Sequence, residues 1–227
     1  MTFHIITLFP EAFRSYLDTS ILARAIKAKK VRVKFYNPYD FLPAKKRADD
    51  RPFGGGPGMV MRAEPILKAV EKAVYNLKPK TYKLIIFSPG GKQFTNQLAE
   101  KWSRRVGDLI LICGRYEGID ARVKKILRAC LPRGMAEEIS VGPYVLTGGE
   151  LPALAVLDGV TRRLPGVLGK DESVEERRVA SPAVYTRPEI LEYRGKKYRV
   201  PKVLLSGHRA KIELWKTRSG KSSGVVV

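Results

Sequence analysis

The feature that most constrains this chain is a strand, a glycine-bearing turn and a helix, which follow one another three times. The pattern occurs within residues 83–105, within 108–130 and, less cleanly, within 138–160. Alternating strands and helices of this kind build a parallel sheet, and ligands bind at the carboxyl ends of its strands. We therefore predict an α/β fold in which the three turns meet at one edge, around a nucleotide- or nucleoside-sized pocket.

The third unit, continued to residue 163, offers the clearest sign of a ligand. Short apolar pieces alternate with Gly142, Gly148 and Gly149, and apolar residues then follow at helical spacing. A backbone that turns on glycine before a helix exposes unpaired N–H groups and lets a flat ligand lie against it. A plain strand–turn–helix connection inside a core fits the same residues.

The residues before the first unit predict further elements and a second glycine-rich segment. We expect strands over 3–9 and 31–36, and helices over 13–26 and 64–76. Four glycines follow Arg51 within nine residues, but the spacing is neither that of a phosphate-binding Walker loop nor that of a dinucleotide-binding turn. The polar residues 38–52 before them are either a solvated loop or a phosphate contact.

Composition indicates the partner and the compartment. The formal net charge of +21 favours a polyanionic partner, although a generally basic proteome or thermal adaptation also raises the Lys and Arg content. Cys113 and Cys130 lack metal or redox spacing, and we expect buried thiols in a reducing cytoplasm. No apolar run is long enough to cross a membrane, and no charged leader precedes the first strand, so we expect neither membrane insertion nor secretion.

The pattern changes after Arg162. We predict a first domain over residues 1–163, a flexible linker over 164–185 and a basic, mostly helical domain over 186–227. Residues 159–227 carry 16 basic and 7 acidic residues, so positive charge is densest in this C-terminal part. A helix start is expected at Ser206–His208.

Several ordered motifs together resemble one family. They are Ile5–Pro10, Asp50–Val60, Gly114–Asp120, Glu138–Gly142, Tyr144–Pro152, Pro165–Gly169, Tyr185–Pro188 and Leu205–His208. To about residue 218 the chain is similar to the bacterial tRNA (guanine-N(1))-methyltransferases, which belong to the SPOUT class of S-adenosylmethionine-dependent enzymes. The resemblance implies a homodimer whose N-terminal α/β domain ties a deep trefoil knot, a threading that pattern reasoning alone would not propose.

The resemblance also implies where the cofactor, S-adenosylmethionine, binds. The residues carried over are Phe87, Ser88, Pro89, Gly114, Tyr116, Glu117, Ile139, Gly142, Tyr144, Leu146, Gly148 and Gly149. Backbone groups of these loops would satisfy the adenine edge, and the Glu117 carboxylate would hold the ribose or the ammonium group. For Tyr144 and Leu146, the alternative is a role in the pocket wall or in the core of the knot.

The implied reaction methylates guanine N1, which is protonated at neutral pH and needs a general base, while negative charge develops on O6. Arg162 matches the family's arginine before Pro165–Gly169, and its guanidinium suits a guanine edge. The alternative for Arg162 is a contact with phosphate or with a helix end. The family's linker aspartate is missing here, so we expect Glu176 as the base, then Glu175, with Asp171 a distant third. A merely solvated charged run is the alternative.

A second departure is Pro143, which stands where the family commonly has an aspartate. Proline removes a backbone N–H and a carboxylate from the pocket rim, so cofactor affinity or metal dependence is expected to differ. The resemblance implies Mg²⁺ as a further cofactor, but the sequence holds no clear cluster of ligands and we assign no metal site.

The expected partner is tRNA, with its anticodon arm held by the basic C-terminal domain. Basic residues from Arg187 to Arg209 would contact phosphates, and a flipped guanine would enter the pocket of the other subunit. The residues assigned to substrate binding are Arg51, Gly55, Gly56, Arg187 and His208. Two alternatives stay open: another SPOUT enzyme that methylates a ribose or a different base, and an RNA-binding relative that has lost catalysis.

Overall fold

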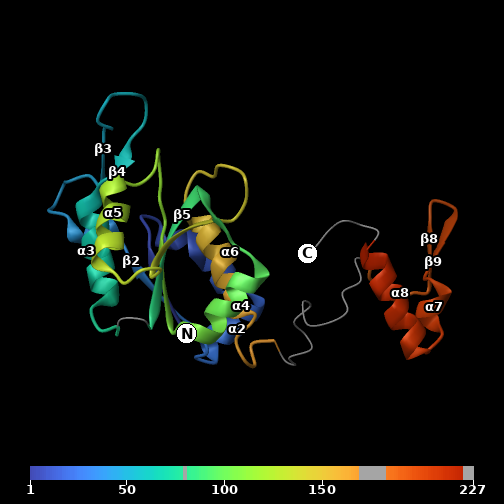
Figure 1. Ribbon diagram of the computed structural model, residues 1–227. Coiled ribbons are helices and arrows are strands. Elements are labelled where there is room, and N and C mark those ends of the chain that lie inside the picture. Colours follow the sequence, from blue (N-terminus) through green and yellow to red (C-terminus); the bar gives the residue numbers. More distant parts are fainter. Residues whose placement is uncertain (79–80, 169–182, 222–227) are drawn as a thin grey trace. The chain divides into compact units, whose positions relative to one another are not determined.

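The chain divides into two compact units, Met1–Leu168 and Gly169–Val227. The structure is a computed structural model, and it describes residues 1–78, 81–168 and 183–221 (Figure 1). The first unit holds the three strand–turn–helix repeats.

A five-stranded sheet forms the centre of the first unit, and all of its pairings are parallel. The strand order is β2-β1-β6-β5-β7. The bounds are β1 Thr2–Ile6, β2 Arg32–Tyr36, β5 Tyr82–Gln93, β6 Asp108–Ile112 and β7 Ala136–Ser140. The predicted α/β fold with a parallel sheet is confirmed.

Helices cover both faces of this sheet because its central strands are apolar on both sides. In β6, Leu109 and Leu111 face one hydrophobic core, while Ile110 and Ile112 face the other. Figure 1 shows α3 and α5 on one side of the sheet and α2, α4 and α6 on the other. These helices are α2 Ser20–Lys27, α3 Ala63–Val74, α4 Asn96–Arg105, α5 Ala121–Cys130 and α6 Glu150–Thr161.

Several predicted elements of the first unit were wrong in their bounds, and the strand expected over 3–9 spans Thr2–Ile6. The helix expected over 13–26 is divided into a 3₁₀ turn η1 (Pro10–Phe13), a short α1 (Arg14–Leu17) and α2, because the backbone leaves the helix before Ser20, whose φ is 52°. The strand of the first repeat, within 83–105, does not end at the glycine-bearing turn but continues to Gln93 with an irregular register. Residues 88–91 are therefore an irregular part of β5 rather than a turn before a helix.

The glycine-rich segment connects two short antiparallel strands, β3 (Asp49–Asp50) and β4 (Val60–Met61). A second 3₁₀ turn, η2 (Pro38–Phe41), lies in the polar stretch before them. Gly54, Gly55, Gly56 and Gly58 all have positive φ, between 80° and 108°. Only glycine adopts such angles without strain, so the loop conformation depends on these residues.

The described part of the second unit contains a β-hairpin, which was not predicted from the sequence. Strands β8 (Ile190–Tyr193) and β9 (Lys196–Arg199) pair antiparallel, and helices α7 (Lys202–Leu205) and α8 (Arg209–Lys221) follow. The two turn residues, Arg194 and Gly195, both have positive φ, as a type I′ hairpin turn requires. Charged residues occupy many positions of both strands, so the two-residue periodicity of a strand is weak in this part of the sequence. The expectation of a mostly helical domain was therefore incomplete.

The first unit extends beyond the boundary expected at residue 163. Residues 164–168, expected in the linker, belong to the first unit, and Leu164 and Val167 pack against its core.

Of the two cysteines, which were both expected to be buried, only Cys113 is buried. Burial raises the pKa of the Cys113 thiol well above its ordinary value. Cys130 is exposed, because it is the last residue of α5, on the outer surface. Within the described residues, no helix is long and apolar enough to span a membrane.

A buried polar group links three strands of the sheet. His4 is 3% exposed, and its ring nitrogens lie 3.0 Å from the Tyr36 hydroxyl and 3.2 Å from Asp108 Oδ1. Burial lowers the pKa of His4 below its ordinary 6.5, and the neighbouring Asp108 opposes this effect in part. The folded protein therefore holds His4 in its neutral form.

This lowered pKa predicts a specific acid sensitivity. Below pH 6.5 the unfolded chain binds a proton at His4 more readily than the folded chain does. The free energy of unfolding therefore keeps its full contribution from His4 above pH 6.5, and this contribution is lost as the pH falls through the folded pKa. Urea unfolding between pH 7.5 and 5.5 should show a smaller loss for His4→Gln than for the parent chain. Equal losses in the two proteins would contradict this account.

Candidate functional site

A cavity of about 260 Å³ opens at the carboxyl edge of the sheet. Its wall consists of the segments that follow the buried parts of β5, β6 and β7, as expected for a parallel α/β sheet. All twelve residues predicted to hold the cofactor line it: Phe87, Ser88, Pro89, Gly114, Tyr116, Glu117, Ile139, Gly142, Tyr144, Leu146, Gly148 and Gly149. Further lining residues, which the sequence analysis did not single out, include Arg115, Ser140, Thr147 and Pro152.

The close approach of two backbones joins the β6 and β7 loops. The Gly149 N–H donates to the Gly114 carbonyl at 2.8 Å. A Cβ atom on Gly149 would lie 2.6 Å from Cys113 Cα and 2.9 Å from Gly114 N, which is too close for any side chain. The start of α6 is therefore pressed against the end of β6, and glycine is the residue that permits it.

The β7 loop is shaped by its own polar contacts. The Ser140 hydroxyl donates a hydrogen bond to the Gly142 carbonyl at 2.8 Å. The same hydroxyl oxygen accepts a hydrogen bond from the Gly142 N–H at 3.2 Å. Tyr144 folds back over Gly142, and its hydroxyl donates to the Val141 carbonyl at 3.3 Å. The Tyr144 ring is still 53% exposed, so one wall of the cavity is an aromatic surface open to solvent.

The β6 loop carries a strained residue and a carboxylate. Tyr116 has a φ of 59°, which is unusual for a residue other than glycine. The next residue, Glu117, donates its N–H to the Met59 carbonyl at 3.0 Å, and its side chain occupies the space that a Cβ on Gly58 would need. This contact anchors the base of the glycine-rich segment to the cavity wall.

An ion pair between a buried carboxylate and a partly exposed arginine supports the floor of the site. Glu150, the first residue of α6, is 4% exposed and accepts a hydrogen bond from Thr7 Oγ1 at 2.8 Å. Its other oxygen lies 3.0 Å from Arg115 Nε, and the Arg115 guanidinium lies 4.5 Å from the centre of the Phe9 ring. The positive end of the α6 dipole also favours this carboxylate. The motif Gly114–Asp120 contained Arg115, but nothing in the sequence pointed to its partner.

The predicted catalytic and substrate residues do not all meet at this cavity. Arg162 caps the opposite end of α6 from Gly149, roughly 18 Å away for a helix of this length, and it is not among the lining residues. Its neighbour Arg163 is buried and donates to Asn96 Oδ1 at 2.8 Å. Glu175, Glu176 and Asp171 lie outside the described residues.

The residues assigned to substrate binding are dispersed. Arg51 lines a separate hollow between the β3–β4 loop, α3 and α5, with Phe53 and Arg122 among its neighbours. Gly55 and Gly56 lie in the same loop with open space around them. Arg187 and His208 belong to the second unit, where the His208 carbonyl accepts the Ile212 N–H at 3.0 Å as α8 begins.

No metal centre can be assigned in the described part of the chain. No three His, Cys, Asp or Glu side chains gather there in a way that could hold an ion. Pro143 is exposed on the β7 loop, between Gly142 and Tyr144 of the cavity wall.

The crowding at Gly149 predicts a sharp difference between two glycine substitutions. Gly149→Ala forces the Cys113–Gly114 backbone to shift and should lower the free energy of unfolding by about 1–3 kcal/mol. Gly90→Ala is the matched control, because nothing lies within 4 Å of the added atom. Urea denaturation of both variants checks this, and equal stabilities would contradict the close packing.

Comparison with known proteins places the whole chain in one family. A model of the family described as tRNA (Guanine-1)-methyltransferase TrmD matches residues 1–224. A tRNA (guanine-N(1)-)-methyltransferase of Clostridioides difficile is 43% identical over 221 residues, which cover 95% of this chain and 90% of the relative. Proteins of the same name from Cupriavidus taiwanensis and Dictyoglomus turgidum are each 44% identical, covering 95% and 94% of this chain and 82% of either relative. The resemblance carried by the motifs is therefore confirmed, and the chain belongs to the tRNA (guanine-1)-methyltransferase family.

Proposed function

We propose that this protein transfers a methyl group from S-adenosylmethionine to N1 of the guanine on the 3′ side of the tRNA anticodon, position 37. The observation that carries the proposal is the cavity around which the β5, β6 and β7 loops of a member of this family come together. Such an enzyme would work in the cytoplasm, where its tRNA substrate is found.

The residues of the cavity suit an adenosine-like ligand that carries a positive charge. The absence of a Cβ lets the Tyr144 ring lie against Gly142 and lets the Cys113–Gly114 backbone lie against Gly149, so the loops around the cavity pack closely. The Tyr144 ring and Leu146 supply apolar area for a flat base, and Glu117 supplies a carboxylate for hydroxyl or ammonium groups. The volume of about 260 Å³ is close to the lower end of the roughly 300–1,000 Å³ found for small-molecule sites.

When bound, the cofactor supplies an electrophilic methyl group on a sulfonium. The task of the protein is to bring guanine N1 into line with it, to remove the N1 proton and to stabilise the charge on O6. The guanidinium of Arg162 fits the O6 role, because its planar fork can donate two parallel hydrogen bonds to a guanine edge. Glu176 or Glu175 would accept the proton.

The position of Arg162 favours a homodimer. Arg162 and the cavity lie at opposite ends of α6, inside one compact unit, so this side chain does not reach the cavity of its own chain. A second copy would bring an Arg162 to the bound guanine. The trefoil knot implied by the resemblance stays a prediction, and so does a role for Mg²⁺.

A methylation assay with product analysis tests the function. Purified protein, S-adenosylmethionine and unmodified tRNA should yield 1-methylguanosine at position 37, and a tRNA with adenine at that position should gain no methyl group. A different methylated nucleoside would assign the chain another specificity. Cofactor binding measured by calorimetry, without any methyl transfer, would instead indicate an RNA-binding relative that has lost catalysis.

The assignment of the base is tested by single substitutions in the linker. Glu176→Gln should lower the single-turnover rate at least 100-fold, in keeping with the roughly 10²–10⁴-fold contribution of a general base, and Glu175→Gln should have a smaller effect. Glu71→Gln, on the exposed surface of α3, is the matched control and should leave the rate unchanged. If neither linker variant slows the reaction more than a few-fold, the base lies elsewhere.

A further inference from the structure

The hairpin of the second unit has two chemically different faces. Paired residues of an antiparallel hairpin share a face, and the pairs alternate between the two faces along the strands. The pairs Leu191–Tyr198 and Tyr193–Lys196 lie on one face, which we call the tyrosine face. The pairs Ile190–Arg199 and Glu192–Lys197 lie on the other. Apolar and aromatic groups are thus gathered on one side of this charged segment.

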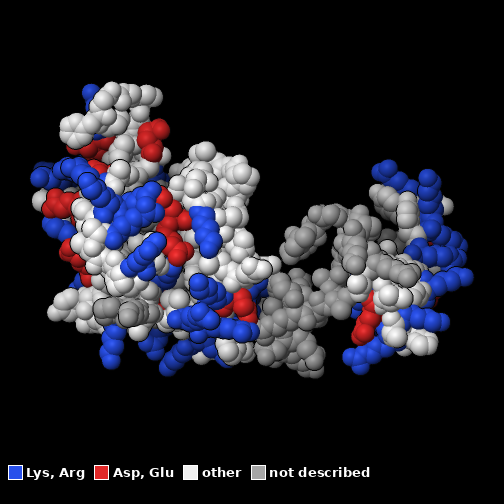
Figure 2. Space-filling view, in the orientation of Figure 1, with Lys and Arg blue, Asp and Glu red and all other residues white. Residues whose placement is uncertain are grey.

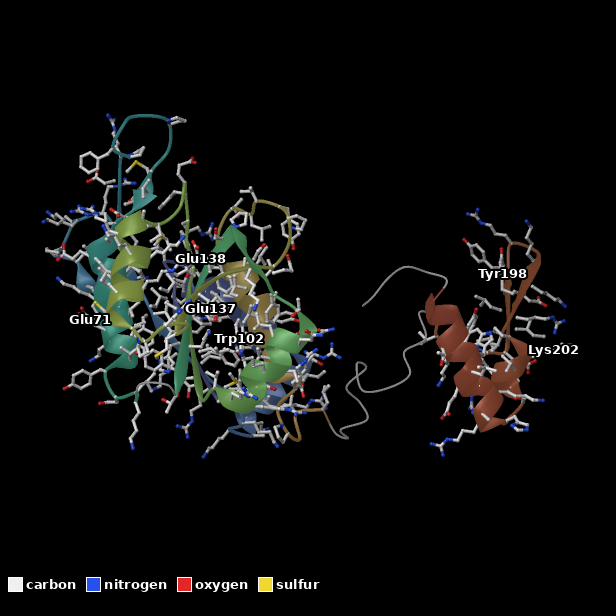
Figure 3. All side chains as sticks on the ribbon, in the orientation of Figure 1. Glu71, Trp102, Glu137, Glu138, Tyr198 and Lys202 are labelled. Carbon is white, nitrogen blue, oxygen red and sulfur yellow. The ribbon has the colours of Figure 1, made fainter. Side chains whose placement is uncertain are left out.

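The tyrosine face is open to solvent. The exposed fractions are 56% for Leu191, 58% for Tyr193 and 54% for Tyr198. Tyr198 lies directly across from Leu191 and diagonally from Tyr193, so the three side chains form one continuous apolar surface. Figure 3 shows Tyr198 on the hairpin. This face adds little to the packing of its own unit.

Positive charge surrounds this surface. The Arg194 guanidinium lies 5.3 Å from the centre of the Tyr193 ring, and Lys196 shares the tyrosine face. Between Arg187 and Lys202 the chain has six basic residues and two acidic ones, and one of the acidic residues, Glu192, pairs with Lys197 at 2.9 Å. Figure 2 shows Lys and Arg side chains gathered over this part of the second unit.

We propose that the tyrosine face is a stacking platform for unpaired bases of the tRNA anticodon loop, with phosphates held by the cations around it. The proposal rests on the proposed function, because tRNA is the occupant. Exposed aromatic rings interleaved with Lys and Arg are the means by which proteins bind single-stranded nucleic acid. Bases inside an A-form helix are stacked and inaccessible to such rings, so the loop is the target rather than the stem.

The chemistry of the face argues against a protein as its occupant. The centres of protein–protein interfaces are depleted of lysine, because a desolvated ammonium group needs a partner. Here Lys196 borders the apolar surface directly. A polyanion satisfies both features, since its bases cover the rings and its phosphates meet the cations.

Binding measured as a function of salt separates stacking from charge. An anticodon stem–loop RNA would be titrated with the full-length chain at several KCl concentrations. Tyr193→Leu/Tyr198→Leu keeps apolar bulk but removes the rings, and should weaken binding about 10-fold or more with an unchanged salt slope. Lys196→Gln should instead make the plot of log K against log salt less steep, by about the amount that one phosphate contact contributes.

Conservative and distant variants control the experiment. Tyr193→Phe/Tyr198→Phe keeps both rings and should bind like the parent chain. Tyr75→Ala removes an 82% exposed tyrosine from the first unit and should also leave binding unchanged. The double leucine variant should lose no affinity for a fully paired duplex with the same stem sequence, since that RNA offers no unstacked base.

Three results would overturn the proposal. These are leucine variants that bind the stem–loop within two-fold of the parent, an equal loss of binding to the duplex, and a shift in oligomeric state by light scattering, which would make the face a contact between protein copies. Failure of the proposed function would look different. The chain would then bind the stem–loop through its tyrosines while methylating another nucleoside, or none.

Discussion

The hydrogen bond between Gly149 and Gly114 is the contact on which the site depends, because it holds the start of α6 against the end of β6. Without that contact, the β6 and β7 loops would not close around a common cavity. The position of Glu150 follows from it, since the first residue of α6 is carried beneath the loops to meet Thr7 and Arg115. One backbone contact thus arranges both the wall and the floor of the site.

The Arg115 guanidinium explains why the floor tolerates the buried Glu150 carboxylate. Leaving this carboxylate alone in a low-dielectric interior would cost several kcal/mol, whereas the guanidinium, the Thr7 hydroxyl and the helix dipole together offset that cost. Arg115 is also covered by the Phe9 ring, from the segment that follows β1. The floor therefore ties β1, β6 and α6 together, and the cavity rests on the same elements as the hydrophobic core.

The alternation of apolar strands with helices was enough to predict the parallel sheet, because strands such as β6 are apolar on both faces and must be covered on both sides. The twelve residues that the motifs assigned to the cofactor all line one cavity, because loops at the carboxyl ends of parallel strands lie at the same edge of the sheet. Contacts between distant residues could not be predicted: Glu150 with Thr7 is 143 positions apart and has no local signal. The hairpin at Arg194–Gly195 was missed because charged residues occupy many positions of its strands. The role of Arg162 was assigned from the resemblance, and the sequence did not predict that this residue lies at the end of α6 far from the cavity.

The pairing of Arg115 with Glu150 has an electrostatic consequence for the two ligands that we propose. A protein with a formal net charge of +21 repels a cationic nucleoside, and a neutralised arginine in the floor, with Glu117 in the wall, removes the nearest source of that repulsion. The residual long-range repulsion is screened by salt, and so is the attraction for a polyanion. Rising ionic strength therefore favours occupancy of the cavity by the sulfonium while it releases the RNA, so the two halves of the active complex respond to salt in opposite directions.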